Sequence, residues 1–117
     1  MKENIIQAKS FQFVIEVVEI YKVLVKTKKE FTLSKQLLRS GTSIGANIEE
    51  AIGGQSKKDF IAKLSISYKE ARESLYWIRL LEATDYLDEK QAKELGEKAN
   101  ELCRILSSIL QSSKRNL

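Results

Sequence analysis

The chain has 117 residues, enough for one domain with a buried core, and 43% of them are hydrophobic while 31% are charged. This composition excludes a disordered chain, and no apolar run reaches the roughly 20 residues that a membrane-spanning helix needs. Histidine and proline are absent, and a single cysteine rules out an internal disulfide. Because the start of the chain also lacks a signal-peptide pattern, we expect a cytoplasmic protein with no membrane association.

The net charge of +4 is unevenly distributed along the chain. Residues 1–39 contain eight Lys or Arg against four Glu, whereas residues 40–117 contain twelve residues of each sign. Clustered cations can neutralise nucleic-acid phosphates, although scattered lysines more often form only a solvated surface. The candidate nucleic-acid contacts are Lys22, Lys26, Lys28, Lys29, Lys35, Arg39, Lys57 and Lys58.

Apolar residues recur with a helical period along almost the whole chain. The expected helices cover residues 10–29, 33–53, 57–83 and 88–111. Their expected N-caps, whose side-chain oxygens can accept an unpaired backbone N–H, are Ser10, Thr32, Ser56 and Asp88. The chain outside these helices is expected to fray at both ends. Four helices with short connections predict an all-α fold, an antiparallel up-down-up-down four-helix bundle that forms one domain over residues 1–117.

The buried stripes of the first and last helices follow from the same period. In the first helix, the buried stripe is expected to begin at Phe11 and to reach Leu24. In the fourth helix, alternating spacings of three and four select Ala92, Leu95, Ala99, Leu102, Leu106 and Ile109. Gly53 and Gly54 are expected to end the second helix, because glycine readily takes the left-handed conformation typical of C-terminal caps.

The segment SGTSIGANIEEAIGG, residues 40–54, contains four of the five glycines. A phosphate-binding loop would place glycines before a helix, with a Walker lysine or the dinucleotide-binding spacing, and neither is present. The apolar period instead runs through the segment, which indicates a helix. An interior glycine costs about 1 kcal/mol relative to alanine, so Gly41 and Gly45 predict a site where a neighbouring helix packs closely.

Two of the expected helices carry polar side chains one turn apart, namely Asn47 with Glu50 and Glu70 with Glu73. Glutamate pairs on facing helices raise the alternative of a carboxylate-bridged metal site. Such sites also use histidines, which this chain lacks, and no EF-hand spacing is present. We therefore expect no metal and no cofactor. We interpret the four residues, with Ser or Thr hydroxyls and a Tyr or Arg as partners, as a polar network that fixes helix register.

Catalytic constellations are missing from the sequence as well. No Ser–His or Cys–His pair exists, and Cys103 lies within the fourth expected helix, where a packed thiol is the ordinary finding. The sequence therefore predicts a protein without enzymatic activity and without catalytic residues.

The run QLLRSGTSIGANIEEA resembles the signature of a bacterial four-helix-bundle family, the 23S rRNA intervening-sequence proteins. The matching positions are Gln36, Leu37, Arg39, Ser43, Ile44, Asn47, Ile48, Glu50 and Ala51. The resemblance continues through FIAKLSISYKEARESLYWIRLLEATDYL and covers roughly residues 10–110. One difference is Ala51, where many members have glycine.

This resemblance implies a homopentameric ring of four-helix bundles without established enzymatic activity. Related proteins are accessory factors of diversity-generating retroelements, in which a basic pentamer contacts a reverse transcriptase and nucleic acid. Partners of these kinds are therefore expected for this chain by resemblance.

Two functions remain open at this point. The first is an oligomer that binds RNA or DNA, or a nucleic-acid enzyme, through the basic residues. The second is a protein-only scaffold or adaptor. Both involve self-association, for which the sequence offers apolar residues at positions expected to face outward, namely Ile15, Val18, Ile61, Ile66 and Tyr76.

Overall fold

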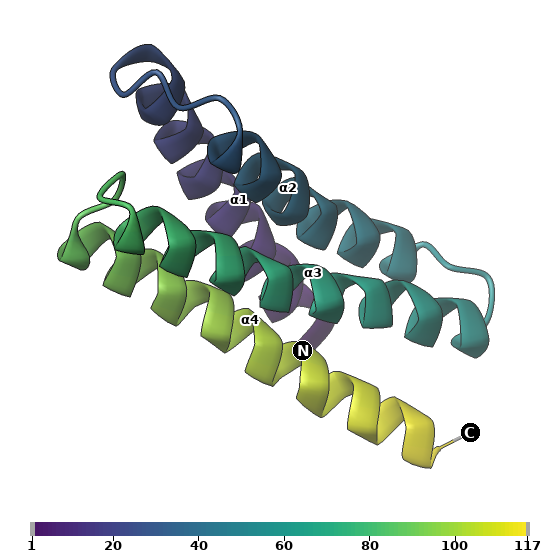
Figure 1. Cartoon of the computed structure of the whole chain (residues 1–117). Coiled ribbons are helices and arrows are strands. Elements are labelled where there is room, and N and C mark those ends of the chain that lie inside the picture. Colours follow the sequence, from purple (N-terminus) through teal and green to yellow (C-terminus); the bar gives the residue numbers. More distant parts are fainter. Residues whose placement is uncertain (1, 117) are drawn as a thin grey trace.

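The protein folds into four helices arranged as a bundle. In the computed structural model, residues 2–116 are described, with side chains from residue 5 onward. The helices are α1 (Lys2–Lys26), α2 (Leu33–Ile52), α3 (Lys57–Ala83) and α4 (Glu89–Arg115), with no strand in the described range. Figure 1 shows that consecutive helices run in opposite directions. The expected all-α four-helix fold is thus confirmed.

Each helix packs against two others. α1 and α3 both pack against α2 and α4, whereas within residues 2–116 the diagonal pairs, α1 with α3 and α2 with α4, make no close backbone approach. The molecule measures 47 × 21 × 20 Å. The α1–α2 and α3–α4 connections lie at one end of this rod, and the α2–α3 connection lies at the other (Figure 1).

The first and last helices, α1 and α4, extend further than the sequence predicts. α1 begins at Lys2 rather than at residue 10. Ser10 is therefore not an N-cap. It lies buried inside the helix, and its hydroxyl donates to the carbonyl oxygen of Gln7 at 3.0 Å. The added turns bury Ile6 in the core, which stabilises the longer helix. α4 likewise continues to Arg115 and is followed by a turn at Asn116. The ends expected to fray are therefore helical over the rest of the described range, and residues 1 and 117 lie outside it.

The buried face of α1 also differs from the prediction. Phe11 is 66% exposed, and the buried stripe is formed instead by Ile6, Phe13, Val17 and Leu24. The reason is that α1 carries apolar residues on every side, so the sequence period alone does not select the buried one. On α4, where the other faces are polar, all six predicted positions are buried. Ile61 on α3, expected to face outward, packs partly buried against the core.

Capping hydrogen bonds explain where α3 and α4 begin and where α2 ends. The Ser56 hydroxyl accepts the Asp59 N–H at 3.0 Å, and Asp88 and Gln91 form a reciprocal capping box with bonds of 2.7 and 3.1 Å. These two N-caps are confirmed. The predicted left-handed cap at Gly53 and Gly54 is wrong, because the φ of Gly53 is −85° and no described glycine has a positive φ. The turn that follows α2 is held by a hydrogen bond in which the Gly54 N–H donates to the Ala51 carbonyl oxygen at 3.1 Å.

The glycines inside α2 face α1. A Cβ atom built on Gly41 would lie 3.1 Å from Cγ1 of Val17, closer than ordinary carbon contacts, and one on Gly45 would lie 3.4 Å from Cγ2 of Val14. A larger residue at position 41 would therefore force the two helices apart. The missing side chain sets how closely α1 and α2 approach each other at this level of the bundle.

Candidate nucleic-acid interface

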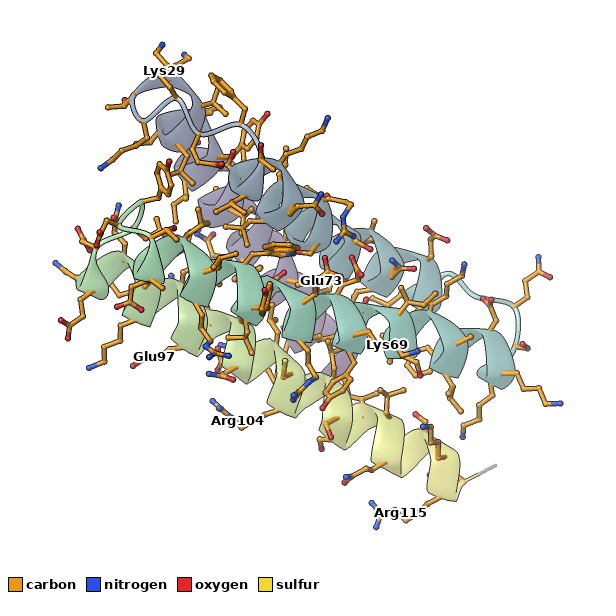
Figure 2. The ribbon with its side chains drawn as sticks, viewed as in Figure 1. Lys29, Lys69, Glu73, Glu97, Arg104 and Arg115 are labelled. Carbon is orange, nitrogen blue, oxygen red and sulfur yellow. The ribbon has the colours of Figure 1, made fainter. Side chains whose placement is uncertain are left out.

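Five exposed lysines gather around the connection between α1 and α2. Figure 2 shows Lys29 at the outermost end of this connection. We call the set the basic turn; it consists of Lys22, Lys26, Lys28, Lys29 and Lys35. All five were candidate nucleic-acid contacts in the sequence, and the fold places them on the last turns of α1, the connection itself and the first turn of α2.

The backbone of the basic turn directs successive side chains to different sides. Lys29 adopts a left-handed conformation with φ 56°, which is unusual for a residue with a side chain. The next N–H, that of Glu30, donates to the Leu24 carbonyl oxygen at 3.0 Å and ties the chain back to α1. Glu30 is consequently turned inward and is only 8% exposed.

The Glu30 carboxylate caps the start of α2. It accepts the backbone N–H groups of Ser34, Leu33 and Thr32 at 2.7, 3.0 and 3.1 Å, and the Ser34 hydroxyl donates to the Glu30 carbonyl oxygen at 2.7 Å. Thr32 was expected to be the cap, but its side chain makes no capping bond. The prediction is wrong because a carboxylate two residues earlier reaches three unpaired N–H groups at once.

The capping bonds also fix the charge state of Glu30. Burial by itself would raise the pKa of this carboxyl, but the hydrogen bonds from Ser34, Leu33 and Thr32 together outweigh burial and hold the pKa below its ordinary value. Glu30 is therefore ionised at neutral pH. Its negative charge faces the partial positive charge at the N-terminus of α2, which is a favourable position.

The lysines of the basic turn form few ion pairs. Among the ion pairs of the described residues, only one involves this set, the exposed contact between Lys22 and Glu19 at 3.8 Å. Phe31, which follows Glu30, is 58% exposed. Beside the turn is a hollow of about 170 Å³ lined by Glu19, Ile20, Val23, Leu24, Lys28, Tyr86, Leu87 and Gln91.

Arg39, the sixth candidate on this half of the chain, is in a different situation. Its guanidinium donates to Glu70 at 2.9 Å and also contacts Glu73, both on α3. The Trp77 indole N–H donates to Glu73 at 2.9 Å and helps to hold that carboxylate in place. The charge of Arg39 is thus already balanced by two carboxylates, and this residue does not belong to the basic turn.

The four residues expected to form one polar network belong to separate contacts, one within α2 and the others across the seam between α2 and α3. The Asn47 amide donates to the carbonyl and hydroxyl oxygens of Ser43 at 2.9 and 3.1 Å. Glu50 pairs with Lys63 at 3.2 Å. Glu70 and Glu73 pair with Arg39. The single network is therefore wrong, because one turn of spacing on α2 does not bring Asn47 and Glu50 to the level of these two carboxylates.

Sequence reasoning missed the polar contact that does lie inside this seam. The hydroxyls of Ser40 and Ser74, both fully buried, are 2.8 Å apart, and the buried Ser67 hydroxyl donates to the Ile44 carbonyl oxygen at 2.8 Å. Their spacing was the available signal, since Ser67 and Ser74 are two turns apart in phase with the apolar residues of α3. Small hydroxyl residues allow α2 and α3 to pack closely without unsatisfied polar atoms.

The remaining candidates lie away from the basic turn. Lys57 and Lys58 open α3 at the opposite end of the rod (Figure 1), so the eight candidate residues do not form one surface. In the part of the chain whose side chains are described, no group of three or more Cys, Asp or Glu side chains is arranged to hold a metal ion. Among residues 2–116, no helix has both the length and the apolar character needed to cross a bilayer.

Comparison with known proteins agrees with the sequence resemblance. The family model described as "23S rRNA-intervening sequence protein" matches residues 2–108. A crystal structure of a protein of unknown function from the S23 ribosomal protein family of Bacteroides thetaiotaomicron VPI-5482 is 48% identical to this chain, with a TM-score of 0.93. The match covers 95% of this chain and 99% of that one. No protein with a curated description matches the sequence. The chain therefore belongs to the 23S rRNA-intervening sequence protein family.

Proposed function

We propose that this protein is a non-enzymatic, oligomeric helical protein of the cytoplasm that binds the backbone of RNA or DNA through the basic turn. One observation carries the proposal. Glu30, the only acidic residue between Lys22 and Lys35, points inward and caps α2, so its charge is not available to the lysines around it. The α1–α2 connection therefore presents its lysines without an exposed carboxylate of its own, while the exposed acids at this end of the bundle, Glu82, Asp85, Asp88 and Glu89, belong to the α3–α4 side. Surfaces of this kind bind phosphates with little sequence preference and with strong salt dependence.

The position of the basic turn suits this role. It lies at the end of a rod 47 Å long, where a polynucleotide can approach without meeting the sides of the bundle. If several copies assemble side by side, their basic turns lie on one rim, and a single polynucleotide can contact more than one of them. Linked contacts of this kind raise affinity without any new type of interaction.

The test is fluorescence anisotropy of labelled structured RNA and duplex DNA over a range of salt concentrations. We expect binding that weakens steeply with salt and that is lost when Lys26, Lys28 and Lys29 are changed to Glu. The matched control changes Lys57, Lys58 and Lys114 to Glu, which alters the net charge equally at the opposite end of the rod. Equal loss in both triple variants would contradict a specific role of the basic turn, and no binding at low salt would contradict the proposal altogether.

Self-association is supported by exposed apolar side chains on α1 and α3. These are Ile5, Phe11 and Ile15 on α1 and Ile66 and Tyr76 on α3, with Val18 partly exposed beside the first group. We call the two groups the α1 stripe and the α3 stripe. Because α1 and α3 are diagonal in the bundle, the stripes face opposite sides. Two unlike patches on opposite sides suit head-to-tail contact between copies, which can close into a ring such as the pentamer implied by the resemblance.

This arrangement predicts complementation between variants. In light scattering, Phe11→Glu and Tyr76→Glu should each give monomers, because each variant loses one side of every contact. Mixing the two variants should give a heterodimer, since the intact α3 stripe of one can pack on the intact α1 stripe of the other. Ile52→Glu, an exposed change outside both stripes, is the control. Wild-type protein that remains monomeric at micromolar concentration would contradict self-association.

The same stripes favour a second candidate function, a protein-only scaffold or adaptor. Its partner would be another protein, for example a nucleic-acid enzyme such as a reverse transcriptase. The two functions differ in their dependence on the basic turn. If reversal of Lys26, Lys28 and Lys29 leaves both the oligomer and its protein partner in place, and no oligonucleotide binds to the wild type, the adaptor function is favoured.

A further inference from the structure

We infer that the basic turn selects single-stranded nucleic acid, with the ring of Phe31 stacking on an unpaired base. This inference rests on the proposed function, because the lysines of the basic turn supply the phosphate contacts. Phe31 is 58% exposed and is flanked in the chain by Lys28 and Lys29 on one side and Lys35 on the other. A large aromatic side chain in solvent contributes little to the fold, and here it lies beside lysines that can hold the phosphates next to a stacked base.

The backbone holds Phe31 in this exposed position. The left-handed conformation of Lys29 reverses the chain, and Glu30 then turns into the bundle, so that Phe31 turns out. Hydrogen bonds on both sides fix the geometry. The Thr27 N–H donates to the Val23 carbonyl oxygen at 2.8 Å, and the Glu30 carboxylate holds the first N–H groups after Phe31. The ring is thus presented by an ordered backbone, and a ligand need not order the loop in order to bind it.

The combination of one exposed ring with surrounding lysines distinguishes single strands from duplexes. In a single strand, a base can lie flat on an aromatic ring while the neighbouring phosphates contact lysines, and each such stack adds measurable affinity with little base preference. In a duplex, the bases are stacked on each other and their faces are covered. Only the phosphates of a duplex can then reach the basic turn, so Phe31 should contribute nothing to duplex binding.

A second feature of the same region fits an extended, flexible ligand. The hollow beside the turn is lined by Lys28, the half-exposed Val23 and Tyr86, with Glu19 also among its lining residues. This offers a further apolar contact within reach of the same lysine. A strand whose bases are free to turn outward can use both places, whereas a regular duplex cannot.

Lysines around an exposed phenylalanine would also fit an anionic membrane surface. The structure favours nucleic acid over this partner, because only one large apolar side chain, Phe31, projects from the connection between α1 and α2. Stable membrane attachment requires a larger buried apolar area or a second anchor. Vesicle binding is therefore one of the outcomes that the experiment has to measure.

The experiment compares a labelled single-stranded oligonucleotide of mixed sequence with the duplex of the same length, by anisotropy with the full chain. For Phe31→Ala, we expect at least about fivefold weaker binding to the single strand and unchanged binding to the duplex. Phe31→Trp should restore the single-strand affinity, since indole also stacks. Ile52→Ala, which removes an exposed apolar side chain at the far end of α2, is the control and should change neither. Circular dichroism checks that each variant is folded.

Several results would overturn the inference. If Phe31→Ala weakens both probes equally, or neither, the ring does not stack on a base, while loss of all binding on reversal of Lys26, Lys28 and Lys29 would leave the proposed function in place. Absence of oligonucleotide binding by the wild type would overturn both. Flotation with phosphatidylcholine–phosphatidylserine vesicles completes the test. Vesicle binding that depends on Phe31, without a preference for single strands, would identify the ring as a membrane contact instead.

Discussion

The seam between α2 and α3 and the basic turn between α1 and α2 both contain basic residues. The two regions differ in whether the nearby carboxylates pair with those basic residues or with the backbone. In the seam, Arg39 is balanced by Glu70 and Glu73 across two helices. In the basic turn, the nearby acid, Glu30, is used to cap a helix. Three fixed N–H groups at a helix start hold a carboxylate without ordering anything else, whereas pairing with a lysine would cost the conformational entropy of a long side chain. The comparison teaches that a count of charges along a sequence does not show where the surface is positively charged. The backbone conformation determines whether each carboxylate points toward the neighbouring lysines or away from them.

The largest expected change in the free energy of unfolding comes from removing the carboxylate of Glu30 beside the basic turn. Glu30→Ala leaves the N–H groups of Thr32, Leu33 and Ser34 without their partner, and it should lower the free energy of unfolding by about 2 kcal/mol. Glu30→Gln, which keeps one acceptor oxygen, should lower it by about half as much. Urea unfolding followed by circular dichroism, at one fixed protein concentration, measures both. Glu19→Ala, an exposed carboxylate on α1, is the control, and equal losses for Glu30→Ala and this control would refute the capping role.

Removing Arg39, the cation of the seam, should lower the free energy of unfolding by a smaller amount. Arg39→Ala leaves Glu70, whose side chain is only 16% exposed, beside Glu73 without a counter-charge. Because the guanidinium itself is half exposed, the expected loss is about 1 kcal/mol. The loss should shrink in a Glu70→Gln, Glu73→Gln background. Arg39→Ala should leave oligonucleotide affinity unchanged. A loss of affinity equal to that of Lys28→Ala would contradict the claim that Arg39 lies outside the nucleic-acid interface.

Acid should remove the stabilising contribution of the Glu30 carboxylate. The pKa of Glu30 is lowered in the folded protein, so its stabilising contribution is complete above its ordinary pKa of 4.5 and is lost as the pH falls through the lowered folded value. The wild type should therefore lose its advantage over Glu30→Gln as the pH drops below 4.5. Thermal unfolding of the two proteins across this range is the measurement. A stability difference that does not change with pH would mean that the carboxylate charge is not what stabilises the turn.

The smallest expected effect on stability is that of Lys22→Ala. The contact between Lys22 and Glu19 is exposed and 3.8 Å long, so its loss should change the free energy of unfolding by less than about 0.5 kcal/mol. The same change should reduce the salt dependence of nucleic-acid binding by up to about one phosphate contact. A larger loss of stability than for Arg39→Ala would reverse the proposed order of the two regions.

The parts of the fold that could be predicted from sequence are those in which local and tertiary preferences coincide. α4 is apolar on one face only, so its six buried positions follow from the period, and Ser56 and Asp88 cap helices by bonds to residues three positions later. α1 is apolar on several faces, and the choice of Phe13 over Phe11 for the core depends on where α2 and α4 lie. That information is not contained in the helical period.

The candidate site shows the same division. The location of the lysines could be predicted because they are neighbours in the chain. The inward direction of Glu30 could not, because it depends on the left-handed residue Lys29 and on the distance to the start of α2. The pairing of Arg39 with α3 likewise depends on the register between two helices, which residues 31 and 34 positions apart do not reveal.

The contact between Gly41 and Val17 has a consequence beyond the core of one subunit. It sets the spacing of α1 from α2, and so the tilt of the α1 stripe relative to the α3 stripe on the opposite side. For a head-to-tail assembly, this tilt decides whether successive copies return to the first one or continue without end as a fibre. In the proposed assembly, a buried residue without a side chain would then control whether the protein forms a finite particle.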